Sequence, residues 1–187
     1  ERRTEQKMKI KLQQWYRILG PRVTVLVSTV DKEGISNAAP VSFVSPVSAD
    51  PALVMIALRP ERHTLANIRE TKDFVLNLPG EEILDKLMIC SKAFPKGVSE
   101  IKEANLTETK AEKVKAPRIA ECFGWIECKF SAEYTAGDHQ IIIGEILDAE
   151  IKDEFYKEIF LCVKAKPILH LTGKDFALLG KTVRASD

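Results

Sequence analysis

Several features are missing from this 187-residue chain, and their absence excludes whole classes of protein. No apolar run approaches the roughly 20 residues that a transmembrane helix requires, so we expect no membrane span. The four cysteines form no C-x-x-C pair, which argues against zinc-ribbon and thioredoxin-type motifs. The 28 Lys and Arg residues are balanced by 27 Asp and Glu residues, and no basic arm stands out. Nucleic acid is therefore not expected as a partner.

Sequence signatures of common catalytic sites are absent as well. The chain contains no P-loop, no Rossmann glycine fingerprint, no G-x-S-x-G elbow and no zinc-ligand spacing, so we predict no metal site. The first residues are charged and lack the apolar core of a signal peptide, so we expect a cytoplasmic location. The cysteines lie among apolar residues and are expected to be buried free thiols, although a redox or ligand-facing role for Cys90 stays open.

What the chain does contain is a succession of β-branched and apolar segments separated by short turns. A mainly β, antiparallel barrel with peripheral α-helices is the architecture that such a pattern favours, in a single domain over residues 1–187. Expected strands are 23–30, 35–45, 52–58, 74–78, 120–136, 139–151, 159–163, 167–171 and 174–178. Expected helices are 4–18, 63–71 and 81–90. Residues 91–117 are polar and lysine-rich, which is typical of a functional loop or lid.

Small and hydroxyl side chains dominate the segment 35–45, although it occupies the place of a strand after the Gly34 turn. Small side chains let a ligand approach the backbone closely, so that main-chain N–H and C=O groups can bind a flat heterocycle. The segment therefore indicates a cofactor site.

A second cluster combines basic residues with a helix start. Arg59 and Arg62 come just before His63 and Thr64, which open the expected helix 63–71. Free N–H groups at a helix start bind phosphate, and arginines add charge-assisted hydrogen bonds. The alternative is a capped surface helix with solvated arginines, because capping residues far outnumber phosphate sites.

Two further segments are candidates for contacts with a ligand. His139 follows the turn Gly137-Asp138 and could donate a hydrogen bond at a pocket mouth, or it could simply bond a neighbouring carbonyl in the turn. Ser91 and Lys92 begin a loop whose hydroxyl and lysines could close over an anion, or which could be solvated.

Together these motifs resemble the flavin reductase-like family, whose members bind FMN in a split β-barrel, and most closely its flavoredoxin and ferric-reductase branch. The resemblance runs from about residue 22 to 179. The matching segments are 37–42, 48–51, 63–68, 74–78, 137–145 and, more loosely, 167–170. Their order and spacing carry the resemblance, since each segment alone is weak.

The resemblance implies a non-covalent FMN near the interface of a homodimer, and it assigns roles by position. Residues beside the isoalloxazine ring, mainly through their backbone, would be Asn37, Ala38, Ala39, Pro40, Val41, Ser42 and Phe43. Ser45 and Ser48 would lie near the ribityl chain, and Arg59, His63 and Thr64 near the phosphate. Ser91 and Lys92 would belong to a loop over the cofactor, and His139 would lie where nicotinamide stacks, as an orienting residue.

The activity implied is an NAD(P)H-dependent reductase that passes electrons through FMN to free flavin, a ferric complex or a redox partner protein. The alternative is a non-enzymatic FMN-binding electron carrier. A pyridoxamine-phosphate-oxidase-like enzyme ranks below both, because the chain shows no basic cluster dedicated to a second phosphate. A purely structural β-barrel adaptor would bind no flavin. Neither the choice between NADH and NADPH nor the electron acceptor is encoded in a recognisable motif.

Overall fold

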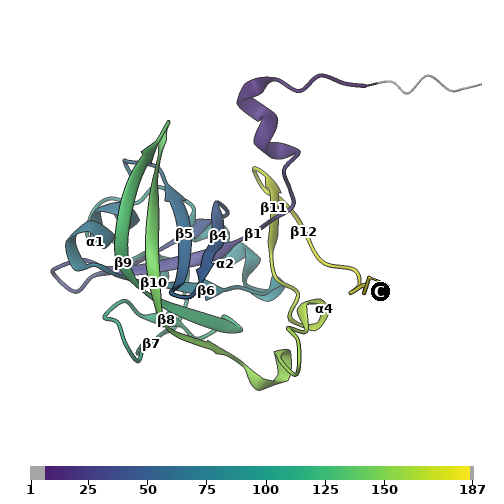
Figure 1. Cartoon of the computed structure of the whole chain (residues 1–187). Helices are drawn as coiled ribbons and strands as arrows, with labels where there is room; N and C mark the ends of the chain where they lie inside the picture. Colours follow the sequence, from purple (N-terminus) through teal and green to yellow (C-terminus); the bar gives the residue numbers. More distant parts are fainter. Residues whose placement is uncertain (1–6, 186–187) are drawn as a thin grey trace, which may run out of the picture.

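The structure, a computed structural model, describes residues 7–185 and is built around one seven-stranded antiparallel sheet in the order β3-β2-β6-β9-β10-β5-β4 (Figure 1). Its strands are β2 (Val25–Val30), β3 (Ser36–Val41), β4 (Val44–Ala49), β5 (Ala52–Leu58), β6 (Asp73–Leu78), β9 (Gly124–Ala136) and β10 (His139–Ile151). The smaller sheets contain β1 (Arg22–Val23), β11 (Leu169–Thr172) and β12 (Asp175–Ala177), and β7 (Glu108–Thr109) with β8 (Arg118–Ile119). Helices are η1 (Leu12–Arg17), α1 (His63–Thr71), η2 (Glu81–Ile83), α2 (Leu84–Cys90), α3 (Glu100–Glu103), η3 (Asp153–Phe155) and α4 (Cys162–Ala165).

The sheet curls because its two edge strands, β3 and β4, are consecutive in the chain and only Ser42 and Phe43 separate them. The backbone N–H of Ala57 on β5 donates to the Phe43 carbonyl at 2.9 Å, which extends the pairing of β5 to this connection. We call the meeting place of the two edges, residues 42–43, the seam. Because β3 is an edge strand, it tolerates Pro40, which has no N–H to give to a further strand.

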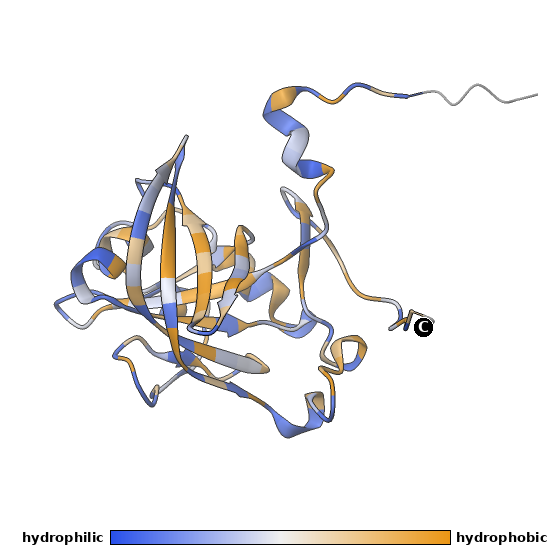
Figure 2. Ribbon diagram, in the orientation of Figure 1, coloured by the Kyte–Doolittle hydropathy of each residue, from blue (hydrophilic) through white to orange (hydrophobic). Residues whose placement is uncertain are grey.

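The inner face of the barrel forms one apolar core. β2 contributes Val25 and Val27, and α1 inserts Leu65 and Ile68, all of them at most 2% exposed. Figure 2 shows the corresponding alternation of hydrophobic and hydrophilic residues along the barrel strands. Gly144 on β10 is required here, because a Cβ at this position would lie 2.4 Å from the Phe74 ring.

A second apolar cluster covers the outer face of β2 and β3. Leu26 and Ala38, whose side chains point away from the barrel interior, pack with Leu87 of α2 and Ile101 of α3. The barrel strands are therefore buried on both faces in this region. Cys90 and Cys122 belong to the same cluster and Cys128 to the inner core, so these three are buried free thiols, as expected, whereas Cys162 on α4 is a partly exposed free thiol.

The predicted fold class, a mainly antiparallel β-barrel with peripheral helices, is confirmed, and several elements match their expected bounds. Strand 52–58, helix 63–71 and strand 139–151 coincide with β5, α1 and β10. Part of the unassigned segment 91–117 forms α3 and β7. Within residues 7–185, no helix has the length and apolar character that crossing a membrane would require.

Three predicted elements differ from the structure. The segment 35–45, expected as one strand, is divided between β3, which ends at Val41, and β4, which begins at Val44. The helix expected over 4–18 is reduced to the single 3-10 helix Leu12–Arg17, and its first three positions lie outside the described residues. None of its side chains is buried, and the edge contact of Tyr16 with Phe43, with ring centroids 6.1 Å apart, is too little packing to stabilise a longer helix in water. The strand expected over 159–163 is wrong, since Phe160 forms an isolated bridge with Tyr156 and Cys162 already begins α4.

Candidate functional site

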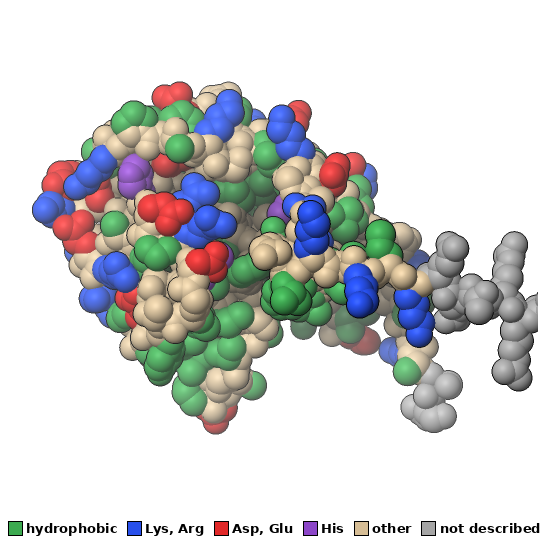
Figure 3. Space-filling model, turned by 90° about the horizontal axis from the view of Figure 1, so that it is seen from above, with side chains coloured by type: hydrophobic (Ala, Val, Ile, Leu, Met, Phe, Trp, Pro, Cys, Tyr) green, Lys and Arg blue, Asp and Glu red, His purple; other side chains and the backbone are tan. Residues whose placement is uncertain are grey.

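A cavity of about 310 Å³ opens at the seam of the barrel, where six elements and their connections meet. In the space-filling view, a hollow on this face is bordered by basic and histidine side chains (Figure 3). Its lining residues are Ala39, Pro40, Val41, Ser42, Phe43, Ala57, Leu58, Arg59, Arg62, Thr64, Cys90, Ser91, His139 and His170.

One wall of this seam cavity is made of short side chains from neighbouring strands. Ala39 and Pro40 come from β3, and Ala57 comes from β5. These residues leave the backbone of both strands within reach of a bound molecule, as expected from the composition of segment 35–45. The wall therefore suits a flat ring better than a bulky chain.

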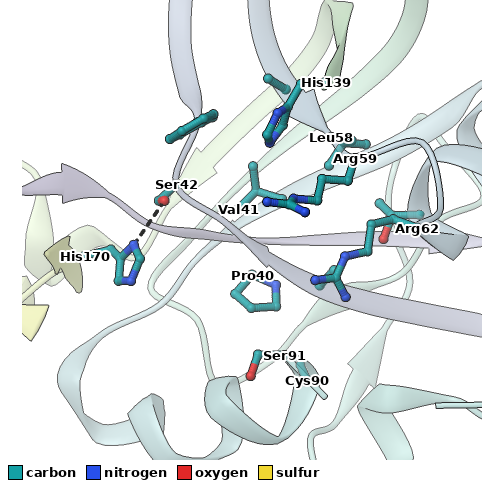
Figure 4. Close-up of a pocket in the computed structure, with 14 residues that line it drawn as sticks. Pro40, Val41, Ser42, Leu58, Arg59, Arg62, Cys90, Ser91, His139 and His170 are labelled. Carbon is teal, nitrogen blue, oxygen red and sulfur yellow. Dashed lines mark hydrogen bonds between the residues drawn. The ribbon is translucent and has the colours of Figure 1, made fainter. Parts of the chain in front are cut away.

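The opposite side of the cavity is basic. Arg59 and Arg62 point into it from the connection between β5 and α1 (Figure 4), and Thr64 lies in the first turn of the helix. Arg62 makes no salt bridge within 4.0 Å among the described residues, and Arg59 only approaches Asp138 at 4.0 Å. No side chain caps the first turn of α1, and since Leu65 N–H already donates to the Arg62 carbonyl at 3.1 Å, the N–H groups of His63 and Thr64 are the ones available to a ligand among the described residues. This side of the cavity is thus suited to an anion.

His139 enters the cavity from the beginning of β10. Its Nδ1 lies 2.7 Å from Oδ1 of Asp138, and its ring is tilted against Phe43 with the ring centroids 5.2 Å apart. The hydrogen bond to His139 holds the pKa of Asp138 below its ordinary value, so Asp138 is a carboxylate near neutral pH. A carboxylate can only accept, so Nδ1 carries a proton toward Asp138 and the ring orientation is fixed.

His170 faces the same cavity from β11, on the other side of Ser42 (Figure 4). Its Nδ1 lies 3.3 Å from the Ser42 hydroxyl and 3.3 Å from Nη2 of Arg22. Sequence reasoning left His170 out of the site, as it did Ala57 and Leu58 of the lining, whereas Arg62 belonged to the expected phosphate cluster and a ligand-facing role for Cys90 was left open. The only signal for His170 was the loosely matching segment 167–170.

Eight of the residues predicted to bind a cofactor line the seam cavity, together with His139. They are Ala39, Pro40, Val41, Ser42, Phe43, Arg59, Thr64 and Ser91. Asn37, His63 and Lys92 instead line an adjoining cavity of about 140 Å³, which shares Ala39, Arg62, Thr64 and Cys90 with the first. Whether any of these residues contacts a cofactor stays a prediction.

The remaining three predicted residues do not line the seam cavity. Ala38 has no exposed surface and packs under α2 and α3, because side chains of a strand alternate between its faces. Ser45 and Ser48, expected near a ribityl chain, lie along the edge strand β4, where the Ser45 hydroxyl donates to the carbonyl of Pro46. The register of β4 against β5 carries both serines away from the cavity.

A buried polar cluster supports the basic side from behind. Thr64 donates through its hydroxyl to Oδ1 of Asn37 at 3.0 Å, and Asn37 donates to Oε2 of Glu100 at 2.7 Å. All three are at most 6% exposed, and burial raises the pKa of Glu100. Beside them, burial and the Glu100 charge raise the pKa of Cys90 to about 12. Cys90 is therefore a protonated thiol at neutral pH, which argues against a redox role.

An apolar cleft of about 530 Å³ adjoins the seam cavity and shares Ser42, Phe43, Ala57 and His139 with it. Its other walls are mostly apolar, and they include side chains of the N-terminal segment that are largely exposed. The residues that complete the lining of the cleft are Trp15, Tyr16, Leu19, Val23, Val44, Met55, Ala136 and Ile141, together with the charged Arg22 and Asp138.

Comparison with protein families and curated proteins gives consistent matches. A family model described as the flavin reductase like domain matches residues 19–177. An uncharacterized protein of Aquifex aeolicus is 36% identical over 163 residues, which cover 83% of each chain. One from Methanothermobacter thermautotrophicus is 37% identical over 140 residues, covering 73% of this chain and 66% of that protein.

Solved structures show the same fold over nearly the whole chain. Nitrilotriacetate monooxygenase component B of Bacillus cereus superposes with a TM-score of 0.87 at 24% identity, covering 97% of this chain and 100% of that one. 2-Nitrobenzoate 2-nitroreductase NbaA of Pseudomonas fluorescens gives 0.83 at 27% identity, over 98% and 95%. Flavoredoxin of Desulfovibrio vulgaris gives 0.84 at 18% identity, over 98% and 97%.

Proposed function

The chain belongs to the flavin reductase-like family, and from that premise we propose that it binds FMN and passes electrons from NAD(P)H to an acceptor. The acceptor would be free flavin, a ferric complex or a redox partner protein. One observation supports this proposal above the others. The seam cavity joins a wall of small residues to a pair of arginines at an uncapped helix start, as a ring bearing a phosphorylated side chain requires.

The residues present fit FMN in chemistry as well as in shape. Arg62, with no salt bridge among the described residues, and Arg59 supply two permanent positive charges for a phosphate. The short side chains of Ala39, Pro40 and Ala57 leave backbone groups free to bond a heterocycle. When bound, FMN supplies a ring that accepts a hydride and gives up electrons one or two at a time.

Within this mechanism the chain positions the reactants. The seam would hold the ring of FMN against β3 and β5, and Arg59 and Arg62 would hold its phosphate. His139, kept in one orientation by Asp138, lies at the junction with the apolar cleft and orients the nicotinamide or the acceptor. Hydride transfer needs no side chain that acts as a general acid or base, so a catalytic triad is not required for this reaction.

The absorbance of the purified protein tests this proposal. A yellow flavin band that bleaches anaerobically on addition of NADH or NADPH is the expected result. A band that bleaches with dithionite but with neither nucleotide would identify an electron carrier that receives its electrons from another protein. A colourless protein that binds no added FMN would refute flavin binding altogether.

Replacing His139 by alanine should slow flavin reduction by NAD(P)H while FMN stays bound, because His139 touches the mouth shared with the apolar cleft rather than the arginine side. We expect a decrease of roughly tenfold to a hundredfold, the range of a lost positioning contact. Stopped-flow measurement of flavin bleaching gives the rate, and the flavin content of the purified variant gives the binding. An unchanged rate would remove His139 from the mechanism.

We also propose that the chain forms a homodimer. Trp15, Leu19 and Val23 are each at least half exposed beside the apolar cleft, and such neighbouring apolar side chains are typical of a covered surface. A second copy would complete the wall of the cleft. Light scattering would give twice the 21.0 kDa mass of the chain if this is correct.

A reducing compartment fits the four free cysteines, none of which forms a disulfide in the described part of the chain. We therefore propose a cytoplasmic location, which cell fractionation would test.

A further inference from the structure

Ser42 occupies a special position, because its side chain lines three cavities at once. These are the seam cavity, the apolar cleft and a third cavity of about 170 Å³ beside α2 and β11. It stands at the seam between the two edge strands, so a ring bound there would meet its hydroxyl. Whether this hydroxyl donates or accepts toward a ligand depends on what its other partner requires.

That partner is His170, and the residues around its ring determine its tautomer. Nη2 of Arg22 lies 3.3 Å from Nδ1, and a guanidinium can only donate. The carbonyl oxygen of Gly173 lies 3.4 Å from Nε2, and a carbonyl can only accept. Both contacts require the same state, in which Nε2 carries the proton and Nδ1 is an acceptor.

Arg22 is itself held firmly in place. Its guanidinium also donates to the carbonyls of Tyr16 at 2.7 Å and of Leu171 at 3.0 Å, and it packs over the rings of Tyr16 and Phe43. Arg22 therefore presents a fixed donor to His170. Burial and the Arg22 charge lower the pKa of His170, which agrees with a neutral ring. Arg22 is the charged group that lowers this pKa, while β12 faces the ring with Phe176 and the seam faces it with Ser42.

The direction of the hydrogen bond between Ser42 and His170 follows from the tautomer of His170. The Ser42 oxygen lies 3.3 Å from Nδ1, shown as the dashed line in Figure 4, and Nδ1 accepts. The single lone pair of Nδ1 is shared between Arg22 and Ser42, each 3.3 Å away, and a hydroxyl that faces an acceptor can only donate, so the Ser42 proton points toward His170. What remains on the oxygen toward the cavities are lone pairs, which can only accept.

We propose that Arg22 and His170 act as positioning residues that make the Ser42 hydroxyl an acceptor toward the cavity, so that the site prefers the reduced flavin ring over the oxidised one. The inference rests on the proposed function for the identity of the ligand. Reduction adds an N–H donor to a ring nitrogen that is only an acceptor when oxidised. An acceptor-only hydroxyl bonds the reduced ring and leaves the oxidised nitrogen unpaired. The chain would thereby raise the reduction potential of the bound flavin.

The first test needs no flavin. The chain has three histidines, so the ring nitrogens of His170 can be assigned by NMR of the ¹⁵N-labelled, flavin-free protein with a His170→Asn variant as reference. We expect the neutral tautomer with the proton on Nε2 at pH 7. A proton on Nδ1, or a doubly protonated ring, would overturn the inference whatever the flavin measurements give.

The second test compares FMN affinity in the two redox states, through the reduction potential of bound and free FMN. Ser42→Ala and His170→Leu should each lower the preference for reduced FMN about tenfold, which corresponds to about 30 mV for a two-electron couple. His170→Asn, which keeps an acceptor near the position of Nδ1, should restore most of it. Ser131→Ala, on the exposed face of β9, is the matched control and should leave the potential unchanged.

An unchanged or increased potential in Ser42→Ala would overturn the proposal. If the wild-type chain bound no FMN at all, the proposed function would fail, and the NMR result would still decide the hydrogen-bond polarity. The two failures are therefore distinguishable.

Discussion

Replacing Arg62 by alanine should weaken FMN binding about tenfold to a hundredfold while leaving riboflavin binding unchanged. A hydrogen bond to a charged group contributes about 1.5–3 kcal/mol, and each 1.4 kcal/mol is a factor of ten in affinity. Arg62 lines the seam cavity beside the uncapped start of α1 and has no salt-bridge partner among residues 7–185, so its charge is available to a phosphate. Fluorescence titration of the flavin-free protein with FMN and with riboflavin measures both affinities.

The comparison of the two ligands makes this experiment specific. Riboflavin has the same ring and ribityl chain but no phosphate, so a general distortion of the site would weaken both ligands equally. Arg69→Ala is the matched control on the same helix, because Arg69 is exposed and bonds Glu133 on β9 through its Nε at 3.1 Å. An equal loss for FMN and riboflavin, or no loss for either, would place the phosphate elsewhere.

The sequence predicted the barrel well where local pattern and tertiary structure agree. The strand 139–151 follows the turn at Gly137 and pairs with β9 as a hairpin, so both of its ends could be located in the sequence. Helix 63–71 lies between a proline turn and a strand, and its Leu65 and Ile68 enter the core. The N-terminal segment shows the opposite case, since Leu12 and Trp15 have helical spacing but stay 82% and 55% exposed.

The candidate site was predictable only in part, because a cavity depends on which segments the fold brings together. Residues 37–43 could be recognised from their small side chains, yet Ala38 faces the outer core and only its neighbours line the cavity. Which face of the sheet each of these side chains points to cannot be assigned without the register of the strand. His170 lies 128 residues from Ser42 in sequence, and no local sequence pattern predicts their contact.

Replacing Glu127 by alanine should destabilise the protein by about 3–5 kcal/mol, because it leaves Nε of Arg118 and two backbone N–H groups unpaired, although Asp148 and Glu150 still pair the Arg118 charge. The Glu127 side chain has no exposed surface and receives Nε–H of Arg118 at 2.6 Å. It also accepts the backbone N–H groups of Glu112 at 2.9 Å and Lys113 at 2.6 Å. One carboxylate thus fastens the segment before β8 to the barrel strand β9. Urea unfolding at neutral pH measures the loss, which is a large share of a typical 5–15 kcal/mol stability.

The control for this prediction is Glu133→Ala on the same strand, whose pair with Arg69 is partly exposed. It should cost at most about 1 kcal/mol, as surface pairs do. A loss of the same size in both variants would mean that burial of Glu127 contributes nothing, which would contradict the account of the network.

Acid should erase the difference between Glu127→Ala and the wild type. Burial alone would raise the pKa of Glu127, but the N–H groups of Glu112 and Lys113 and the Arg118 guanidinium outweigh it and hold this pKa below its ordinary value. A carboxyl whose folded pKa is lowered contributes its full stability above the unfolded pKa, about 4.3 for glutamate, and loses it as pH falls through the folded value. The unfolding free energies of the two proteins should therefore converge below about pH 4. Curves that stay parallel down to pH 3 would show that Glu127 is not the group that titrates.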